Sequence, residues 1–225
     1  MKKYYAIIVA GGSGSRMQTA EAKQFLLLDG LPILMHTMKA FDDCILKPQI
    51  LLVLNIHQQQ HWEELCTKYN FSVPHEVVKG GQERYHSVKN ALKLIKGQGI
   101  VAVHDAVRPL VSTSLIEKSF LVAEEKGNAV AAVHPTDSIR ITEYDRNKAL
   151  NRDMVHLIQT PQTFQSIQLK KAYLQPFRNG FTDDASVVEH AGYEINIIEG
   201  ERENLKITYL VDLALAGLIR QKKGS

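Results

Sequence analysis

A glycine-rich loop close to the N-terminus is the first place where residue types and spacing indicate chemistry. The loop consists of Ala10, Gly11, Gly12, Ser13 and Gly14, directly after a strongly apolar run. Glycine has no Cβ and tolerates positive φ, so the backbone amides of such a loop can point at a bound anion. Taken alone, these glycines fit a phosphate-binding loop and a tight strand-to-helix turn about equally well.

Two cations behind the loop favour phosphate binding. Arg16 closes the loop, and Lys23 follows seven residues later. A guanidinium fork and a lysine ammonium both suit phosphate oxygens. Either cation alone is as readily a solvated surface charge, but their place behind the glycines predicts that a triphosphate is held there.

Two familiar phosphate loops match this segment poorly. A Walker A loop requires Gly-Lys-Ser/Thr at a fixed distance, and that pattern is missing here. The dinucleotide fingerprint accommodates Gly12 and Gly14 but finds Met17 where its third glycine belongs, and the next expected strand ends at Asn55 rather than at an acid. A nicotinamide-dependent dehydrogenase is therefore disfavoured.

A carboxylate at the end of another apolar run is the second candidate site. Asp105 follows residues 100–103 and precedes Arg108 and Pro109. Mg²⁺ prefers oxygen ligands shared with substrate phosphates, so Asp105 is a candidate ligand for it. An N-cap or a turn residue before Pro109 is the alternative role. Arg108 is either its ion-pair partner or a ligand for an acceptor.

A second glycine pair marks a third candidate site. Gly80, Gly81 and Gln82 precede a helix-like segment that contains Ser87. These residues fit a loop that recognises a base, or a plain loop with a helix cap. Two more polar segments, Arg152 with residues 159–164 and residues 199–208, have the composition of ordinary loops.

The elements that must position these residues alternate in type. Short runs rich in Val, Ile and Leu predict buried strands at residues 5–10, 50–55, 76–78, 100–105, 129–133 and 195–199. Segments with helical periodicity lie at residues 33–41, 61–69, 84–95 and 115–126. This alternation predicts an α/β fold with a mostly parallel, twisted sheet flanked by helices. Ligands lie beyond the carboxyl ends of such strands, which selects residues 11–16, 80–87 and 105–109.

Residues 136–158 interrupt the alternation. Polar and β-branched residues alternate at 138–142, a charged turn follows at 145–148, and residues 154–158 are again strand-like. This pattern predicts a protruding β-arm within a single domain of residues 1–225. A lone hairpin is marginal in water, so we expect the arm to pack against another subunit.

Bulk composition restricts the class of protein. Of the 225 residues, 44% are hydrophobic and 23% charged, which is typical of a folded globular chain. A net charge of +3 is too small to indicate a nucleic-acid partner. The apolar runs are far shorter than the roughly 20 residues that span a bilayer. Two cysteines without a CxxC spacing predict neither a disulfide framework nor a zinc cluster, and we expect a cytoplasmic protein.

Together these motifs resemble the 2-C-methyl-D-erythritol 4-phosphate cytidylyltransferase family. The resemblance runs from Ala6 to Leu218 and rests on the ordered segments AGGSGSRM, KQFLLLDGLPILMHT, GGQERYHSV, HDAVRP, QTPQTF, TDDASVVEHAG and EGERENLKIT. It implies a Rossmann-like nucleotidyltransferase fold, similar to glycosyltransferase-A folds. It also implies CTP and a small sugar-alcohol phosphate as substrates, Mg²⁺ as the cofactor, and a homodimer in which the arm reaches the neighbouring active site.

The resemblance also implies a role for each candidate residue. CTP would lie on residues 10–14, where Arg16 and Lys23 stabilise its α-phosphate, and Asp105 would hold Mg²⁺ beside it. The cytosine would be framed by Gly80, Gly81, Gln82 and Ser87. Arg152 and Lys206 would position the acceptor, and the residues near it would be Ala106, Arg108, Ser138, Thr160 and Thr182. No general base is required, because a phosphate monoester with a second pKa of about 6 is already anionic near neutral pH.

Two alternatives remain at this point. The sister family that makes CDP-ribitol shares HDAVRP and QTPQ, whereas the acidic TDDASVVE segment favours the erythritol enzyme. A catalytically silent nucleotide-binding regulator is the alternative from another class, and the joint presence of Arg16, Lys23, Asp105 and Lys206 argues against it. The chain departs from the family pattern at Ala22, Ser138 and Arg140, which concerns the acceptor rather than the reaction.

Overall fold

The computed structural model describes residues 3–10 and 21–224 of the chain. The predictions for Gly11, Gly12, Ser13, Gly14 and Arg16 lie outside the described residues.

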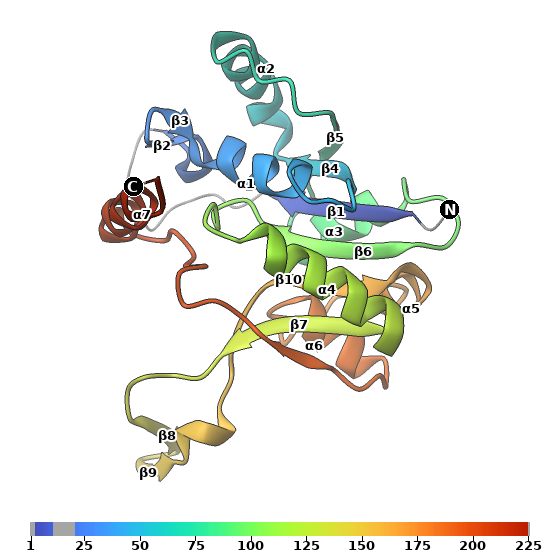
Figure 1. The fold of residues 1–225 in the computed structure, drawn as a ribbon. Helices are drawn as coiled ribbons and strands as arrows, with labels where there is room; N and C mark the ends of the chain where they lie inside the picture. The colour runs from blue at the N-terminus through green and yellow to red at the C-terminus, as the bar shows by residue number, and fades with distance from the viewer. Residues whose placement is uncertain (1–2, 11–20, 225) are drawn as a thin grey trace.

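A seven-stranded sheet forms the centre of the described structure (Figure 1). Its strands lie in the order β11-β7-β10-β6-β1-β4-β5, and all pairs are parallel except those made by β10. The strands are β1 (Tyr4–Val9), β4 (Gln49–Leu54), β5 (His75–Lys79), β6 (Ile100–Asp105), β7 (Asn128–Val133), β10 (Leu157–Gln165) and β11 (Ile197–Glu199). The predicted α/β class and mostly parallel sheet are confirmed, and six of these strands were expected from the sequence.

Helices cover both faces of the sheet, which explains why β1, β4 and β7 are almost wholly apolar rather than alternating. Within β1, Ala6 and Ile8 pack on one face while Ile7 packs on the other. The first face is covered by α1 (Ile33–Asp42), α2 (Gln59–Lys68) and α4 (Thr113–Lys126). The second is covered by α3 (Arg84–Leu92), α5 (Ser166–Ala172) and α6 (Asp184–His190).

Capping residues define both ends of α4. The Ser112 hydroxyl accepts a hydrogen bond from the Leu115 amide at 3.0 Å, which satisfies one of the free donors of the first turn. The helix ends at Lys126 and is followed by Gly127, whose φ of 94° is accessible to glycine at little cost. Between these two ends, α4 forms the crossover connection from β6 to β7.

Smaller elements surround the carboxyl edge of the sheet. They comprise the 3-10 helices η2 (Lys23–Phe25), η3 (Ile56–Gln58) and η4 (Arg152–Met154), the short strands β2 (Leu27–Leu28) and β3 (Leu31–Pro32), and α7 (Leu210–Gly224). The C-terminal α7 lies beside β2 and β3, where Ala216 packs with Leu28 and Ile207 (Figure 1). Among the described residues, no helix is both long enough and apolar enough to cross a bilayer.

The segment 159–164, expected to be a loop on its composition, is instead part of β10. This strand lies antiparallel between β6 and β7, with a register shift between Ile158 and Gln162 around the cis Thr160–Pro161 bond. Gln, Thr and Pro are poor indicators of a central strand, because their polar groups must be satisfied by specific hydrogen bonds when buried. The antiparallel direction brings the beginning of β10 to the edge where the parallel strands end.

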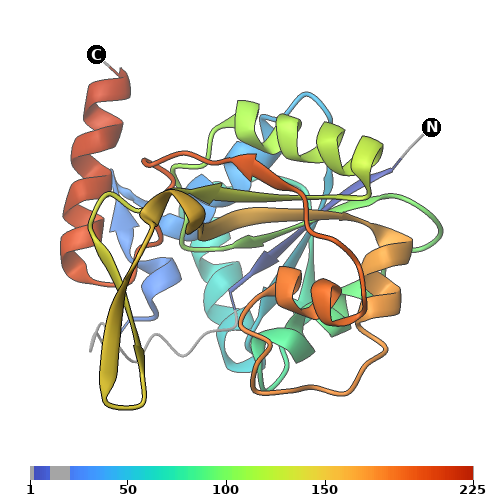
Figure 2. The same cartoon turned by 90° about the horizontal axis from the view of Figure 1, so that it is seen from below.

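The predicted β-arm exists, with one boundary corrected. Its strands are β8 (Ile139–Glu143) and β9 (Arg146–Leu150), and they project away from the main sheet (Figures 1 and 2). The expectation that residues 154–158 form its second strand is wrong. Met154 ends η4, and Leu157 and Ile158 already belong to β10. The apolar residues were therefore a signal of the main sheet, whereas the second arm strand begins with three polar residues and is mostly exposed.

Candidate active site

Two adjoining cavities lie at the carboxyl edge of the sheet. The larger has a volume of about 530 Å³ and is lined by residues that follow β1, β4, β5 and β6, including Ala10, Asn55, Gly81, Gln82 and Ala106, with Lys23 and Gln24 from η2. The smaller, about 280 Å³, is lined by the start of β10 and the segment before α6, including Gln159, Thr160, Gln162, Thr182 and Asp183, and by Arg108. Arg84, Asp105 and Lys206 line both cavities and so form their shared wall.

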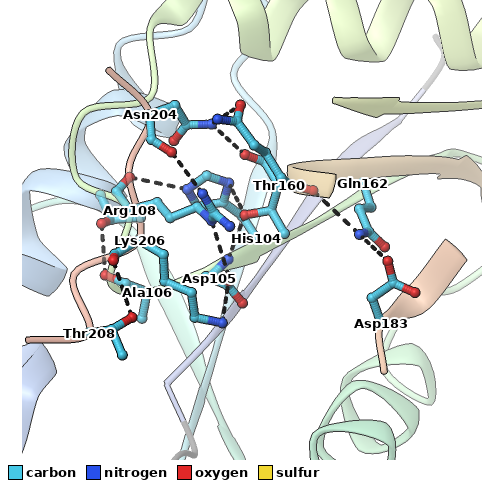
Figure 3. Close-up of polar contacts among 12 residues, drawn as sticks. His104, Asp105, Ala106, Arg108, Thr160, Gln162, Asp183, Asn204, Lys206 and Thr208 are labelled. Atoms are coloured by element: carbon cyan, nitrogen blue, oxygen red, sulfur yellow. Dashed lines mark hydrogen bonds and ion pairs between the residues drawn. The ribbon is translucent and has the colours of Figure 1, made fainter. Parts of the chain in front are cut away.

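Asp105 is the centre of that wall. Its Oδ2 lies 3.0 Å from Lys206 Nζ and 3.2 Å from Arg108 Nε (Figure 3). Its Oδ1 lies 3.8 Å from Arg84 Nε. Burial by itself would raise the pKa of this carboxyl, but the three cations outweigh burial and hold the pKa well below its ordinary value. The carboxylate is therefore ionised throughout the physiological range.

The backbone of Asp105 is fixed by a buried relay of hydrogen bonds. Its amide donates to Thr160 Oγ1 at 3.1 Å, and Thr160 Oγ1 lies 3.1 Å from His104 Nδ1 (Figure 3). His104 Nε2 lies 3.3 Å from the carbonyl oxygen of Arg108. Burial lowers the pKa of His104 to about 3, so the ring is neutral. A carbonyl can only accept, so Nε2 carries the proton and Nδ1 accepts from the Thr160 hydroxyl.

This relay limits the hydrogen bonds that Thr160 can make to an acceptor. Thr160 does line the smaller cavity, as predicted for an acceptor-binding residue. Its single hydroxyl proton, however, is committed to His104, so the hydroxyl is not free to donate to a phosphate oxygen. Sequence reasoning did not assign His104 a role. Its position directly before Asp105 in HDAVRP was the available signal.

The segment after β11 is tied to the turn after β6, and this brings Lys206 to the site. Arg108 Nη1 donates to the Asn204 carbonyl at 2.7 Å, and the Ile207 amide donates to the Val107 carbonyl at 2.9 Å. Asn204 Nδ2 in turn donates to the Thr160 carbonyl at 2.7 Å. The expected ion pair of Arg108 with Asp105 is confirmed. Arg108 also lines the smaller cavity, and its role as an acceptor ligand stays a prediction.

The second glycine pair shapes the far side of the larger cavity. The Gly81 amide donates to the buried Ser87 Oγ at 3.0 Å, and the Gly80 amide donates to the Leu54 carbonyl at 2.7 Å. A Cβ built on Gly81 would lie 2.3 Å from the Cβ of His86, so only glycine fits there. Gly81, Gln82 and Ser87 line the larger cavity, and Gly80 lines a small neighbouring one of about 210 Å³.

Ala106 lines the larger cavity rather than the smaller one expected for an acceptor ligand. Its amide donates to the Val9 carbonyl at 3.1 Å, and its carbonyl accepts from the Thr37 hydroxyl at 2.8 Å. Gln24, which sequence reasoning did not single out, is buried in the same wall. Its Nε2 donates to the Ala10 carbonyl at 3.1 Å, so it holds the beginning of the glycine-rich segment.

Two predicted residues, Arg152 and Ser138, line neither cavity within this chain. Arg152 lies in η4, exposed, and its Nη1 donates to the Thr136 carbonyl at 2.7 Å. Ser138 lies exposed just before β8. Both therefore belong to the arm and its root, apart from the Asp105 wall.

The donor set at the larger cavity fits a Mg²⁺ ion that arrives with a polyphosphate. Asp105 and Glu83 are the acidic side chains that line it, and the described residues contain no cluster of three or more His, Cys, Asp or Glu for a complete metal cage. Mg²⁺ is commonly held by one or two carboxylates together with substrate phosphates. Asp105 Oδ1 has the longest of the three cation distances and is the oxygen better placed to serve as such a ligand.

A mostly parallel sheet with cation-lined cavities at its carboxyl edge defines an α/β protein that binds phosphorylated ligands. The family model described as "IspD: 2-C-methyl-D-erythritol 4-phosphate cytidylyltransferase" matches residues 4–222. The chain belongs to this family.

Individual relatives agree along nearly the whole chain. The 2-C-methyl-D-erythritol 4-phosphate cytidylyltransferase of Porphyromonas gingivalis is 49% identical over 220 residues, covering 97% of this chain and 98% of the relative. That of Bacteroides fragilis is 44% identical, covering 95% and 98%. The crystal structure of 4-diphosphocytidyl-2C-methyl-D-erythritol synthase from Anaerococcus prevotii superposes with a TM-score of 0.83 at 28% identity, covering 98% of this chain and 96% of that one.

Proposed function

We propose that this chain is an enzyme that transfers the cytidylyl group of CTP to 2-C-methyl-D-erythritol 4-phosphate. The products are 4-diphosphocytidyl-2-C-methyl-D-erythritol and pyrophosphate. The observation that carries the proposal is the shared wall of Asp105, Arg84 and Lys206 between two cavities of unequal size. A transfer between two phosphates requires both to lie side by side, and the membership of the cytidylyltransferase family supplies the identity of the two substrates.

The sizes of the cavities support a particular assignment of the substrates. The cavity of about 530 Å³, with its glycine-lined side, suits a nucleoside triphosphate, and the one of about 280 Å³ suits a small sugar-alcohol phosphate. In this assignment Gly80, Gly81, Gln82 and Ser87 contact the cytosine. Arg108, Thr160 and Thr182 surround the acceptor.

The reaction then needs positioning and positive charge rather than proton transfer. An anionic oxygen of the acceptor phosphate forms a bond to the α-phosphorus of CTP, and the bond from that phosphorus to the bridging oxygen breaks as its electron pair leaves with pyrophosphate. Lys206 holds the acceptor phosphate at the shared wall, while Lys23, and by the sequence expectation Arg16, stabilise the charge that develops at the α-phosphate. A bound Mg²⁺ on Asp105 would neutralise triphosphate charge there.

The exposed arm supports a homodimer as part of the proposal. Arg152 and Ser138, assigned to the acceptor by family resemblance, line neither cavity of their own chain. We propose that they serve the neighbouring subunit's acceptor site, with the β8–β9 arm as the means of reaching it. A cytoplasmic location stays a prediction.

The test is turnover with CTP, Mg²⁺ and each of two acceptors, 2-C-methyl-D-erythritol 4-phosphate and ribitol 5-phosphate. Pyrophosphate release measures the rate, and phosphorus NMR identifies the new diphosphate. We expect the methylerythritol acceptor to have the higher kcat/KM. A preference for ribitol 5-phosphate would select the sister activity, and no pyrophosphate release with either acceptor would favour a silent regulator.

A further inference from the structure

Arg84 occupies an unusual position between the two cavities. It is the first residue of α3, three positions after Gly81, and its side chain lines both cavities. Its Nη2 lies 2.6 Å from Asp184 Oδ2, and its Nε lies 3.8 Å from Asp105 Oδ1. One guanidinium therefore connects the beginning of α3, the end of β6 and the beginning of α6.

A cation in the first turn of a helix is locally unfavourable. The first turn of a helix carries a partial positive charge and favours acidic side chains. Burial by itself would lower the pKa of Arg84, but Asp184 and Asp105 outweigh burial and raise it. Conflicts between local preference and fold are expected at functional sites. The structure therefore holds a guanidinium here against the helix dipole.

A buried carboxylate anchors the guanidinium from behind. Asp184 is fully buried, lines neither cavity, and accepts a hydrogen bond from the Tyr173 hydroxyl at 2.6 Å on its other oxygen. A buried carboxylate is costly unless it is paired and hydrogen-bonded, and Asp184 has an ion pair with Arg84 on Oδ2 and a hydrogen bond from Tyr173 on Oδ1. Asp184 lies at the first position of α6, where a negative charge is favoured.

The anchor leaves part of the guanidinium facing the cavities. A guanidinium has five N–H donors in a fixed plane, and the Asp184 contact occupies the Nη2 side. The Nε separation of 3.8 Å from Asp105 is an ion pair too long for a hydrogen bond. Within the described part of the chain, the structure gives the remaining donors of Arg84 no hydrogen-bond partner.

We propose that Arg84 contacts substrate phosphate at the boundary of the two cavities, and that Asp184 and Tyr173 are positioning residues that hold its guanidinium there. The inference rests on the proposed function. As the acceptor oxygen bonds to the α-phosphorus and the electron pair of the breaking bond leaves with pyrophosphate, Arg84 donates hydrogen bonds to the phosphate oxygens. It remains protonated throughout and gives up no proton.

The first experiment compares Arg84→Ala and Arg84→Lys with the wild type, using CTP and 2-C-methyl-D-erythritol 4-phosphate. We expect Arg84→Ala to lower kcat about 100-fold while the Kd of CTP from calorimetry changes less than about 3-fold, since single preorganised donors contribute on this scale. Added guanidinium ion at millimolar concentration should restore part of the kcat of Arg84→Ala. Arg84→Lys keeps the charge without the planar fork and should recover little.

Controls separate this inference from simpler explanations. Arg178→Ala removes an exposed arginine that lines neither cavity and should keep the wild-type kcat. Wild-type turnover together with an unimpaired Arg84→Ala overturns the inference and leaves the proposed function standing. Absence of wild-type turnover contradicts both.

The second experiment tests the anchor by a double-mutant cycle. Tyr173→Phe removes only the hydroxyl that faces Asp184, and we expect it to lower kcat about 5-fold in the wild type and not at all in Arg84→Ala, because its effect acts through Arg84. Tyr85→Phe is the matched control. Its ring stacks on Tyr173 at 4.7 Å, but its hydroxyl donates to backbone carbonyls instead. Equal losses from Tyr173→Phe in both backgrounds, or an equal loss from Tyr85→Phe, would show a structural role and overturn the anchor.

Discussion

The wall around Asp105 and the β8–β9 arm are both rich in charge, but they hold their charges in opposite ways. At the wall, a carboxylate that is 11% exposed meets three cations and a relay of buried hydrogen bonds. On the arm, Lys148 Nζ and Glu143 Oε2 lie 3.4 Å apart with side chains 65% and 61% exposed. Solvent screens such exposed pairs, which contribute roughly 0 to 1 kcal/mol.

The difference shows which charged side chains have positions that a single chain can fix. At the wall, Asp105, Arg84 and Arg108 each have more than one partner, so their positions are determined by the fold itself. The arm has one short two-stranded ladder, and a lone hairpin is marginal in water. We infer that the arm needs a second surface to acquire a defined function, whereas the wall does not.

The largest expected effect comes from breaking the wall at its centre. Asp105→Asn keeps the shape of the side chain but removes the charge that three cations share. We expect kcat to fall at least about 1000-fold, because the cations lose their common partner and the candidate Mg²⁺ ligand is weakened. Asp137→Asn, an exposed change beside the arm, is the control. A kcat within 10-fold of wild type would refute the central role of Asp105.

A cation at the edge of the larger cavity should matter next. We expect Lys23→Ala to lower kcat about 100-fold and to change the Kd of CTP less, since its charge is most valuable when the α-phosphate becomes more negative. Steady-state kinetics and calorimetry measure the two effects separately. Weaker CTP binding with an unchanged kcat would mean that Lys23 serves binding alone.

The buried relay predicts an acid limit to stability. The pKa of His104 in the folded state, about 3, lies below the ordinary value of 6.5, so the unfolded chain binds the proton first as the pH falls. This contribution to the free energy of unfolding is therefore fully present above pH 6.5 and decreases toward pH 3, by up to about 1.4 kcal/mol per pH unit. Urea unfolding in EDTA at several pH values measures the slope. We expect His104→Gln to flatten it, and an unchanged slope would assign the acid sensitivity to other groups.

The smallest effect is expected on the arm. Lys148→Ala breaks its exposed ion pair and should change the free energy of unfolding by less than about 0.5 kcal/mol, because solvent already screens that pair. Urea unfolding provides the measurement. A much larger loss of stability would show that the arm's charges are buried in solution, and would remove the contrast with the wall.

Much of the fold was predictable from local patterns. Continuous apolar runs predicted six of the strands in the sheet, and helical periodicity predicted α1 through α4 with small errors at their ends. Several predicted site positions, among them Lys23, Asp105 and Lys206, do line the same cavity. Sequence reasoning found Asp105 because it ends an apolar strand and Lys23 because it lies behind the glycine-rich loop, and found Lys206 only through resemblance to a family.

The failures share a physical cause. β10 was missed because its polar residues, such as Gln162, are buried by long-range hydrogen bonds, to Asp183 Oδ2 at 2.9 Å and from the Ala185 amide at 2.9 Å. Arg84 was missed because its partner Asp184 is one hundred positions away in the chain. No local period or spacing encodes such pairs.

By itself, the sequence determined the class of the fold, the edge of the sheet where ligands belong, and the residues able to grip phosphate, because these depend on burial and on chemistry local to each strand end. Only the tertiary structure decided that β10 runs antiparallel, that Arg84, Asp105 and Lys206 form one wall, and that Arg152 lies apart from it. Those outcomes depend on which distant segments come together, and that is set by packing of the whole chain.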